Sequence, residues 1–231
     1  AENYSFFNFP PENPTIRWYL EIPGRYYESI GVSILLATMT SILSVLFGVP
    51  AAFGLVRSVI PGRAFLSAIF RVPLQIPSVV IGISFLHLYY AFGRAFDLNP
   101  GGTFAGLLVG HFFHAMPYVV GTTVAVLQRF DMTLEEASII LGASRWRTFR
   151  RVTLPIIMPG VYTGALYSFM VSFGDIPISI FLTTPQFTTF PVEVFLDMDQ
   201  GLEPTMLTAS ALVVVFSLAV MLLVQKLVGL D

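Results

Sequence analysis

One polar segment, Glu135 to Pro155, interrupts the apolar runs of this chain and concentrates charged residues. It reads EEASIILGASRWRTFRRVTLP, beginning with two adjacent glutamates and continuing with four arginines, Arg145, Arg147, Arg150 and Arg151. Such a mixture is suited to binding a surface, either that of another protein or that of an anionic membrane. It does not contain a nucleophile together with a base and an acid.

The segment predicts two short helices joined by a turn. Thr133 and Glu136 have the spacing of a capping box, which starts a helix. Gly142 is suited to ending that helix, because glycine accepts the left-handed conformation that follows a helix. Ser144 is placed to cap a second helix, Arg145 to Val152. Held between two membrane spans, this unit would be a stiff knob that transmits motion; the alternative is a basic loop that binds lipid.

Other polar residues lie within or beside the apolar runs and could line a pathway for a solute. Asp175 is the one acidic residue inside such a run, and Ser172 shares its helix face. A carboxylate at membrane depth faces a cavity, a partner or a substrate. The alternative is that Asp175 caps backbone loosened by Pro177. Further candidates for the pathway are Phe173, Gln75, Ser78, His114 and Tyr118.

No pattern in the sequence predicts catalysis. His111 and His114 share a helix face, but no third metal ligand is near in sequence and cysteine is absent, so hydrogen bonds between helices are favoured over a metal site. The only lysine, Lys226, follows Gln225, so the phosphate-binding G-x-x-x-x-G-K-[ST] loop is missing. We expect no catalytic residue, no cofactor and no nucleic acid partner; any ATP is hydrolysed by another chain.

The composition predicts an all-α integral membrane protein. Only 11% of the 231 residues are charged and 55% are hydrophobic, whereas soluble domains contain about 25% charged residues. The apolar residues fall in runs of about 20 residues or more, the length that a membrane-spanning helix needs. Five spans are expected, at residues 29–55, 74–92, 103–127, 156–182 and 205–228.

The distribution of charge orients these spans. With the first segment outside, nine of the 12 basic residues lie in inner loops, and the three outside are Arg17, Arg25 and Arg94. This arrangement obeys the positive-inside rule, and the opposite topology would reverse it. The predicted organisation is an extracytoplasmic segment, a transmembrane domain, a cytoplasmic loop within it and an external loop, at residues 1–28, 29–231, 129–155 and 183–204 respectively. The external loop is expected to hold a short surface helix near Val192 to Met198.

The spacing in the polar segment resembles the cytoplasmic EAA loop of ATP-binding cassette (ABC) importer permeases: E-A-A, three residues, G, nine residues, I-x-L-P. Here Glu136-Ala137-Ser138 is followed by Gly142 and then by Val152-Thr153-Leu154-Pro155, with serine for the second alanine and valine for isoleucine. The resemblance implies a type I permease bundle in a bacterial inner membrane. Such permeases usually begin with one more helix, so a first, sixth span is expected to be missing from this chain.

The resemblance also implies a role for the loop, which in this family receives force from an ATPase. The residues it assigns to this contact are Glu135, Glu136, Ala137, Ser138, Gly142, Ala143, Arg145, Leu154 and Pro155. The implied partners are two ATPase subunits that hold ATP and Mg, a second permease subunit in a homodimer or heterodimer, an extracytoplasmic solute-binding protein and membrane lipid. The implied mechanism is alternating access.

Two features bear on the solute. The acidic outer segments and Asp175 favour a small organic cation such as a polyamine, which their field would attract. The segment SFGDIPISIF resembles the S-F-D-D or S-F-D-N region of polyamine-type permeases, with Gly174 in place of the first acidic residue. Ferric iron, opine-like or amino-acid-like solutes and phosphonates stay open. The alternatives of another class are a secondary transporter or channel, and a membrane scaffold without transport.

Overall fold

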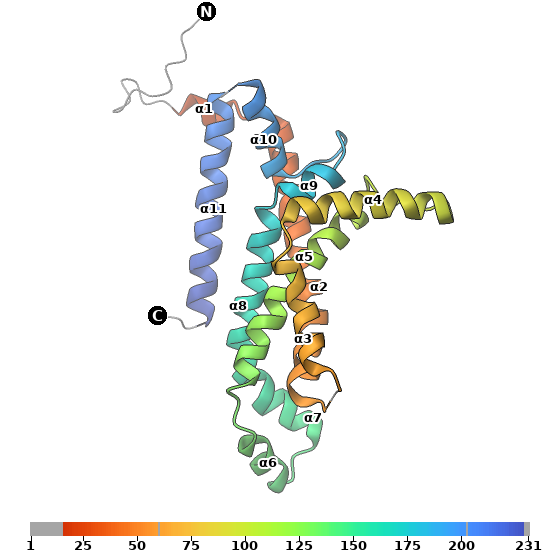
Figure 1. Ribbon diagram of the computed structural model, residues 1–231. Coiled ribbons are helices and arrows are strands. Elements are labelled where there is room, and N and C mark those ends of the chain that lie inside the picture. Colours follow the sequence, from red (N-terminus) through yellow and green to blue (C-terminus); the bar gives the residue numbers. More distant parts are fainter. Residues whose placement is uncertain (1–15, 60, 202, 229–231) are drawn as a thin grey trace, which may run out of the picture.

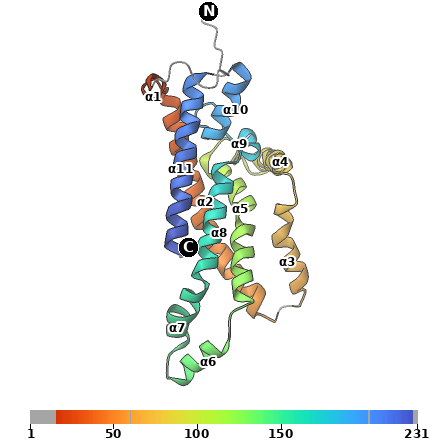
Figure 2. The same ribbon diagram turned by 90° about the vertical axis from the view of Figure 1, so that its left-hand side faces the viewer.

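The computed structural model is a bundle of long helices with short helices at both ends (Figure 1). It describes residues 16–59, 61–201 and 203–228. The centre is formed by three helices that pack along one another: α2 (Gly24–Arg57), α5 (Phe104–Leu127) and α8 (Leu154–Phe173). A further long helix, α11 (Pro204–Val228), runs beside this group in both views (Figures 1 and 2).

Small residues bring the central helices close together. A Cβ atom added to Gly160 would lie 2.6 Å from Cγ2 of Val126, and one added to Gly164 would lie 2.7 Å from Cα of Val119. A larger side chain at Gly164 would move α8 away from α5, and one at Gly160 would at least displace the side chain of Val126. Helices in lipid associate through such close packing because lipid offers no hydrophobic gain. The glycines at four-residue spacing therefore serve helix packing, as their sequence pattern favours.

Five helical segments are long and apolar enough to cross a membrane, which confirms the predicted number. Their bounds are Gly24–Arg57, Ser78–Phe96, Phe104–Leu127, Arg145–Phe173 and Pro204–Leu222. The first begins five residues before the predicted start at Ser29, directly after Pro23. The prediction was based on apolar runs and missed this first turn because the turn contains polar residues such as Arg25 and Glu28.

The second predicted span is bent. Its lead-in forms α3 (Arg63–Arg71) and the 3-10 turn η1 (Val72–Leu74), and the apolar run then forms α4 (Ser78–Phe96). Figures 1 and 2 show α3 running along the bundle and α4 crossing its axis and projecting to one side. Pro73 and Pro77 lie at the bend, where proline removes an N–H donor and disfavours helix at the residue before it. We call α4 the arm.

The fourth predicted span is also interrupted. After α8 ends at Phe173, the chain turns through Gly174–Ile176 into the short α9 (Pro177–Leu182). The break near Pro177 is as predicted, and α9 packs against the arm. The predicted surface helix is confirmed as α10 (Phe190–Gln200).

The two polar ends of the bundle lie far apart. The short α1 (Arg17–Leu20) and α10 are at one end, and α6 (Thr133–Ile140) and α7 (Arg145–Thr148) are at the other (Figure 1). This separation agrees with a topology in which residues 129–155 and 183–204 face opposite sides of a membrane.

Candidate functional site

The segment predicted to take force stands out from the end of the bundle as a compact unit (Figures 1 and 2). It contains α6, a turn, α7 and a π-helical stretch, η2 (Phe149–Thr153), that leads without interruption into α8. We call residues 129–153 the knob. Because α7, η2 and α8 form one continuous helical segment, a displacement of the knob is carried directly into α8.

The turn between α6 and α7 depends on Gly142, as predicted. Its φ of +87° lies in the left-handed region, where a side chain is strained. The N–H groups of Gly142 and Ala143 donate to the carbonyls of Ile139 and Ser138 at 2.9 and 3.1 Å, which closes the end of α6. Ser144 caps α7 as expected, accepting from the N–H of Arg147 at 3.4 Å.

The start of α6 differs from the prediction. The capping box of Thr133 and Glu136 does not form; instead Oδ1 of Asp131 accepts from the N–H and hydroxyl of Thr133 at 2.9 and 2.8 Å. These hydrogen bonds, the backbone one first, lower the pKa of the Asp131 carboxyl. The three-residue spacing to Glu136 favoured Thr133, but Asp131 is also a good capping residue and its side chain takes the N–H of Thr133. The second predicted helix is also not separate, since Arg145 to Val152 continues into α8.

The two adjacent glutamates of the knob face different surroundings. Glu135 is half-buried, and both of its carboxylate oxygens lie 2.8 Å from Nη1 of Arg57 at the end of α2. It also accepts a short hydrogen bond from the hydroxyl of Thr153, next to α8. Glu136 is exposed. Glu135 therefore fastens the knob to two helices of the bundle, and Glu136 is free to meet another chain.

The Arg57–Glu135 pair was missed by the sequence reasoning. The two residues are 78 positions apart, and no local pattern connects them. The available signal was the predicted topology, which places both residues at the same end of the bundle with opposite charges.

Three large apolar side chains at the tip of the knob are exposed in the described part of the chain. Ile140, Leu141 and Trp146 are 83%, 87% and 69% exposed, and the exposed Arg145 and Arg147 flank Trp146. An apolar patch with a charged rim is typical of a surface that binds another protein. The patch belongs to α6, α7 and the turn between them, at the end of the bundle opposite α10 (Figure 1).

The predicted contact residues divide into two groups. Ser138 faces inward, with its hydroxyl 3.0 Å from that of Thr148, and so joins α6 to the following helix. The half-buried members of the predicted set are Glu135, Ser138, Ala143 and Leu154, and the exposed members are Glu136, Ala137, Gly142, Arg145 and Pro155. The contact with an ATPase itself stays a prediction for both groups.

Asp175 is buried and caps α9. Its Oδ1 atom accepts from the N–H groups of Ile178 and Ser179 at 2.8 and 3.2 Å. Of the two sequence interpretations, the cap is therefore observed, and a further role of Asp175 in a pathway stays a prediction. Ser172 and Phe173 are buried just before it at the end of α8.

The remaining pathway candidates are scattered. Gln75 and Ser78 flank the bend before the arm, and the ring of Tyr118 lies 6.3 Å from that of Tyr167 on α8. His114 is half-buried, and within the described chain its Nδ1 atom has no hydrogen-bond partner. None of these residues shares a hydrogen bond with Asp175 in the ranges that the structure covers. Their place in a solute pathway is untested.

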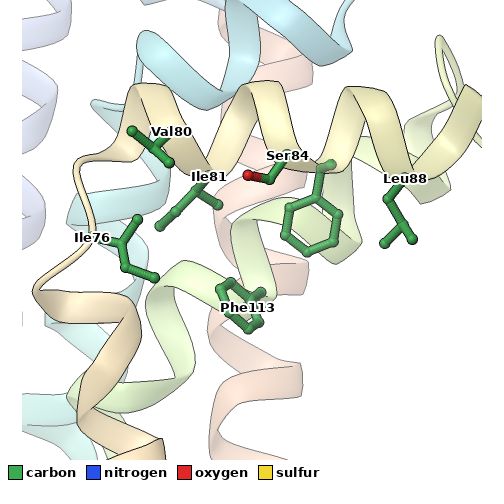
Figure 3. A pocket seen from close by; sticks show the side chains of 7 residues that line it. Ile76, Val80, Ile81, Ser84, Leu88 and Phe113 are labelled. Atoms are coloured by element: carbon green, nitrogen blue, oxygen red, sulfur yellow. The ribbon is translucent and has the colours of Figure 1, made fainter.

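A cavity of about 310 Å³ lies in the angle between the arm and α5. Figure 3 shows α4 crossing above it and Phe113 reaching toward it from α5. Its lining is apolar except for Ser84, and it includes Ile76, Val80, Ile81, Leu88 and Phe113. No predicted pathway residue lines it. The signal in the sequence was the four-residue spacing of Val80, Ser84 and Leu88, which marks one helix face.

At the other end of the bundle, α10 is fastened to the start of α2. Nη2 of Arg25 lies 2.9 Å from Oδ2 of Asp197, and the hydroxyl of Tyr26 donates a short hydrogen bond to the same oxygen. Glu193 lies 3.6 Å from Nε of Arg25. Burial raises the pKa of Glu193, Arg25 opposes that rise and Asp197 adds to it.

Sequence and structure comparisons with known proteins identify the family of this chain. Residues 44–229 match the family described as binding-protein-dependent transport system inner membrane component. The chain belongs to this family. It is a permease of an ABC importer, a multi-pass protein of the bacterial inner membrane and a transport subunit rather than an enzyme. Permeases of this family work with an ATPase and a binding protein.

Curated relatives cover most of the permease. The spermidine/putrescine transport system permease protein PotC of Escherichia coli (strain K12) is 29% identical, over 99% of this chain and 85% of its own length. The putrescine transport system permease protein PotI of the same strain is 30% identical, over 81% of this chain and 68% of its own. A putative 2-aminoethylphosphonate transport system permease protein, PhnV of Salmonella paratyphi A, is 29% identical, over 88% of this chain and 74% of its own.

Solved structures support the fold. A bacterial ABC transporter involved in the import of the acidic polysaccharide alginate matches with a TM-score of 0.74 at 16% identity, over 96% of this chain and 85% of that one. The inward-facing MetNI methionine ABC transporter matches with a TM-score of 0.69 at 16% identity, over 94% and 98%. The permease therefore has the type I ABC permease fold.

Proposed function

We propose that this permease forms part of the membrane pathway of an importer with two ATPase subunits, one of which binds the knob from the cytoplasm. The observation that carries the proposal is the uncovered apolar tip, where Ile140, Leu141 and Trp146 project beyond the bundle. A surface of this kind would be unfavourable in water, and a groove on another protein would bury it. ATP and Mg would be held by the ATPase subunits, since this chain has no phosphate-binding loop.

The attachments of the knob suit the transmission of force. Glu135 joins it to α2 through Arg57 and to the start of α8 through Thr153, and η2 continues into α8. Closure of the two ATPase subunits would therefore rotate α2 and α8 together rather than bend the loop. Such rigid-body motion is the basis of alternating access, and hydrolysis of ATP would reverse it.

A second permease subunit would complete the pathway. The arm projects from the bundle with Val80, Leu88 and Tyr90 about half exposed, and the cavity beneath it is almost wholly apolar. Helices of an identical or related subunit would cover this surface and form the second wall. A solute-binding protein would dock at the opposite end of the bundle, where α10 lies.

For the solute we propose a small organic cation of the polyamine class. PotC and PotI, which carry polyamines in their names, both match most of this permease. The acidic residues of the α10 segment, Glu193, Asp197, Asp199 and Glu203, would attract a cation toward that end. A phosphonate is the second candidate because PhnV is similar over 88% of the chain.

Purification with a tag from native membranes, followed by mass spectrometry, tests the assembly. We expect an ATPase, a permease and a binding protein to co-purify. The complex is then placed in vesicles with labelled spermidine or 2-aminoethylphosphonate, with and without ATP. ATP-dependent uptake of spermidine alone supports the polyamine proposal, and uptake of the phosphonate alone replaces it. A chain that purifies by itself and carries solute without ATP would be a secondary transporter.

A further inference from the structure

A buried histidine bridges the two sides of the break between α8 and α9. His111, on α5, is 2% exposed. Its Nδ1 atom lies 2.9 Å from the hydroxyl of Ser172 in the last turn of α8, and its Nε2 atom lies 3.0 Å from the hydroxyl of Ser179 in α9. One imidazole ring therefore contacts the helix before the break and the helix after it.

The hydrogen-bond directions around His111 form a consistent chain. The hydroxyl of Ser172 donates to that of Thr40 on α2 at 3.3 Å, so it accepts from the Nδ1–H of His111. A neutral imidazole has one donor and one acceptor, which leaves Nε2 to accept from the hydroxyl of Ser179. Four helices, α9, α5, α8 and α2, are thus joined through one ring whose two nitrogens are both paired.

The helix beyond the break determines where the arm lies. Gly82 of the arm touches the first turn of α9 so closely that an added Cβ would lie 2.8 Å from the carbonyl oxygen of Pro177. Asp175 caps α9, and within the described residues its side chain accepts hydrogen bonds from the backbone of Ile178 and Ser179, both in α9 itself. The cap therefore stabilises α9 without fixing its direction relative to α8.

We propose that His111 is a positioning residue that locks α9 and the arm to α8. A displacement that the knob delivers to α8 then moves the arm, and with it the apolar wall of the cavity between the arm and α5 (Figure 3). The movement of α8 by an ATPase rests on the proposed function, whereas the lock itself does not. Ile178 and Leu182 of α9 also pack with Leu107 of α5 in the apolar core, so the ring adds a directional polar connection to this contact. Across the break itself, the backbone of Gly174–Ile176 joins α8 to α9.

A distance measurement on the full transporter tests the lock without any transport. The chain has no cysteine, so spin labels can be attached at two introduced ones, Arg94→Cys on the arm and Tyr162→Cys on α8, both exposed. The labelled permease is diluted with unlabelled copies in lipid nanodiscs, and the distances between labels are measured by pulsed electron spin resonance. We expect a narrow distribution in the parent and a broad one in His111→Leu.

Two further variants separate hydrogen bonding from loss of the ring. His111→Gln keeps one donor and one acceptor, so it should return the distribution toward the narrow form. His114→Leu removes an imidazole one turn away that has no partner at Nδ1 within the described chain, so it should leave the distribution narrow. Ser179→Ala removes only the α9 side of the bridge and replaces His111→Leu if that variant fails to fold. A distribution in His111→Leu or Ser179→Ala as narrow as in the parent overturns the proposal.

Transport gives a second readout. In vesicles, the amount of spermidine taken up per ATP hydrolysed should fall about tenfold in His111→Leu, as expected for the loss of two buried hydrogen bonds, and should recover in His111→Gln. The ATPase rate should stay within about twofold of the parent. Equal losses of uptake and ATPase rate in both variants would indicate a merely structural role and contradict the proposal. Absence of ATP-driven uptake in the parent would refute the proposed function and leave the distance test valid.

Discussion

The knob and the α10 segment (residues 183–204) are both polar connections that carry short helices, yet they relate to the bundle in opposite ways. In the α10 segment, Phe190 and Val192 are buried at 4% and 2% exposure, and Phe190 packs in the core with Tyr26, while the large apolar side chains further along the helix are about half exposed. In the knob, Leu141 is 87% exposed. The α10 segment thus buries part of its apolar surface in its own bundle, whereas the tip of the knob leaves its large apolar side chains between 69% and 87% exposed.

The polar attachments of the two connections are alike. Each is fastened to one end of α2 by an arginine–carboxylate pair, Arg25–Asp197 at the α10 end and Arg57–Glu135 at the knob. Both distances are close to 2.9 Å, so the contrast in exposure does not come from a weaker anchor at the knob. The contrast arises because Phe190 and Val192 pack into the bundle, whereas Leu141 at the tip of the knob is exposed. A firm attachment to the bundle combined with an exposed apolar tip is suited to transmitting force from a bound partner to the helices.

The largest expected effect comes from substituting the glycine at the turn of the knob. Gly142→Asp places a charged side chain at φ +87° beside the apolar tip, which strains the turn and disturbs the surface offered to a partner. We expect uptake to fall at least about a hundredfold. The measurement is ATP-dependent uptake in cells or vesicles, with the amount of permease in the membrane determined by immunoblot.

Gly201→Asp at the end of α10 is the matched control. Gly201 also has a positive φ, +139°, and an added Cβ meets nothing within 4 Å at either glycine. The backbone strain at Gly201 is therefore at least as large, because φ +139° with ψ 153° is a region that essentially only glycine occupies, but the site lies at the other end of the bundle. Equal losses of uptake in the two variants, at equal amounts in the membrane, would remove the functional difference between the two connections.

The next effect separates the two glutamates of the knob. Glu135→Ala leaves Arg57 without its carboxylate partner at a half-buried position, and it should lower the free energy of unfolding by about 1–3 kcal/mol. Glu136→Ala should leave stability unchanged, because Glu136 is exposed, and should weaken co-purification of the ATPase. Thermal unfolding of the purified permease and pull-down of the ATPase measure the two effects. Loss of stability on removing Glu136 alone would contradict this division.

Much of this architecture could be predicted from sequence because local signals specify it. Runs of apolar residues gave the five spans, Gly142 marked the turn of the knob, and the α10 helix began near its predicted position. Each of these features depends on residues that are close to one another in the sequence. Not every local signal was realised, because the capping box of Thr133 and Glu136 does not form.

The remaining features depend on partners that are distant in sequence. Hydropathy shows that residues 78–96 are apolar but not that the helix they form crosses the bundle, since its direction follows from Pro73, Pro77 and contact with α9. Glu135 and Arg57 meet only once the bundle has formed. Asp175 suited a pathway and a cap equally; the structure shows the cap, and the pathway role stays a prediction. Glu135 was predicted as a contact residue and not as an anchor, and the exposed Ile140, Leu141 and Trp146 were not among the predicted contact residues.

A smaller effect is expected at the anchor of the α10 segment. Asp197→Ala removes the acceptor shared by Arg25 and the hydroxyl of Tyr26, and it should cost about 1 kcal/mol, since Arg25 is half exposed to solvent. Hydrogen exchange of α10 amides should rise while those of α6 stay unchanged. Uptake measured well below the melting temperature should change little. A loss of uptake as large as that of Gly142→Asp would show that α10 is also part of the force-transmitting machinery.

The smallest expected effect is a pH dependence confined to the α10 end. Burial raises the pKa of Glu193 above its ordinary value of 4.5, so the folded state binds this proton more tightly than the unfolded state does. The resulting stability is fully present below the ordinary pKa and is lost as pH rises through the raised value. Relative to the parent, Glu193→Gln should therefore lose this pH dependence, with a change in unfolding free energy below about 1 kcal/mol. Thermal melting between pH 4 and 8 measures it, and Asp199→Asn on the same helix, at an exposed position, is the control. The opposite result would be a parent whose stability rises with pH in this range and a Glu193→Gln variant whose stability does not. It would mean that the ion pair of Glu193 with Arg25 outweighs burial. The α10 segment would then be held by charge rather than by its apolar core.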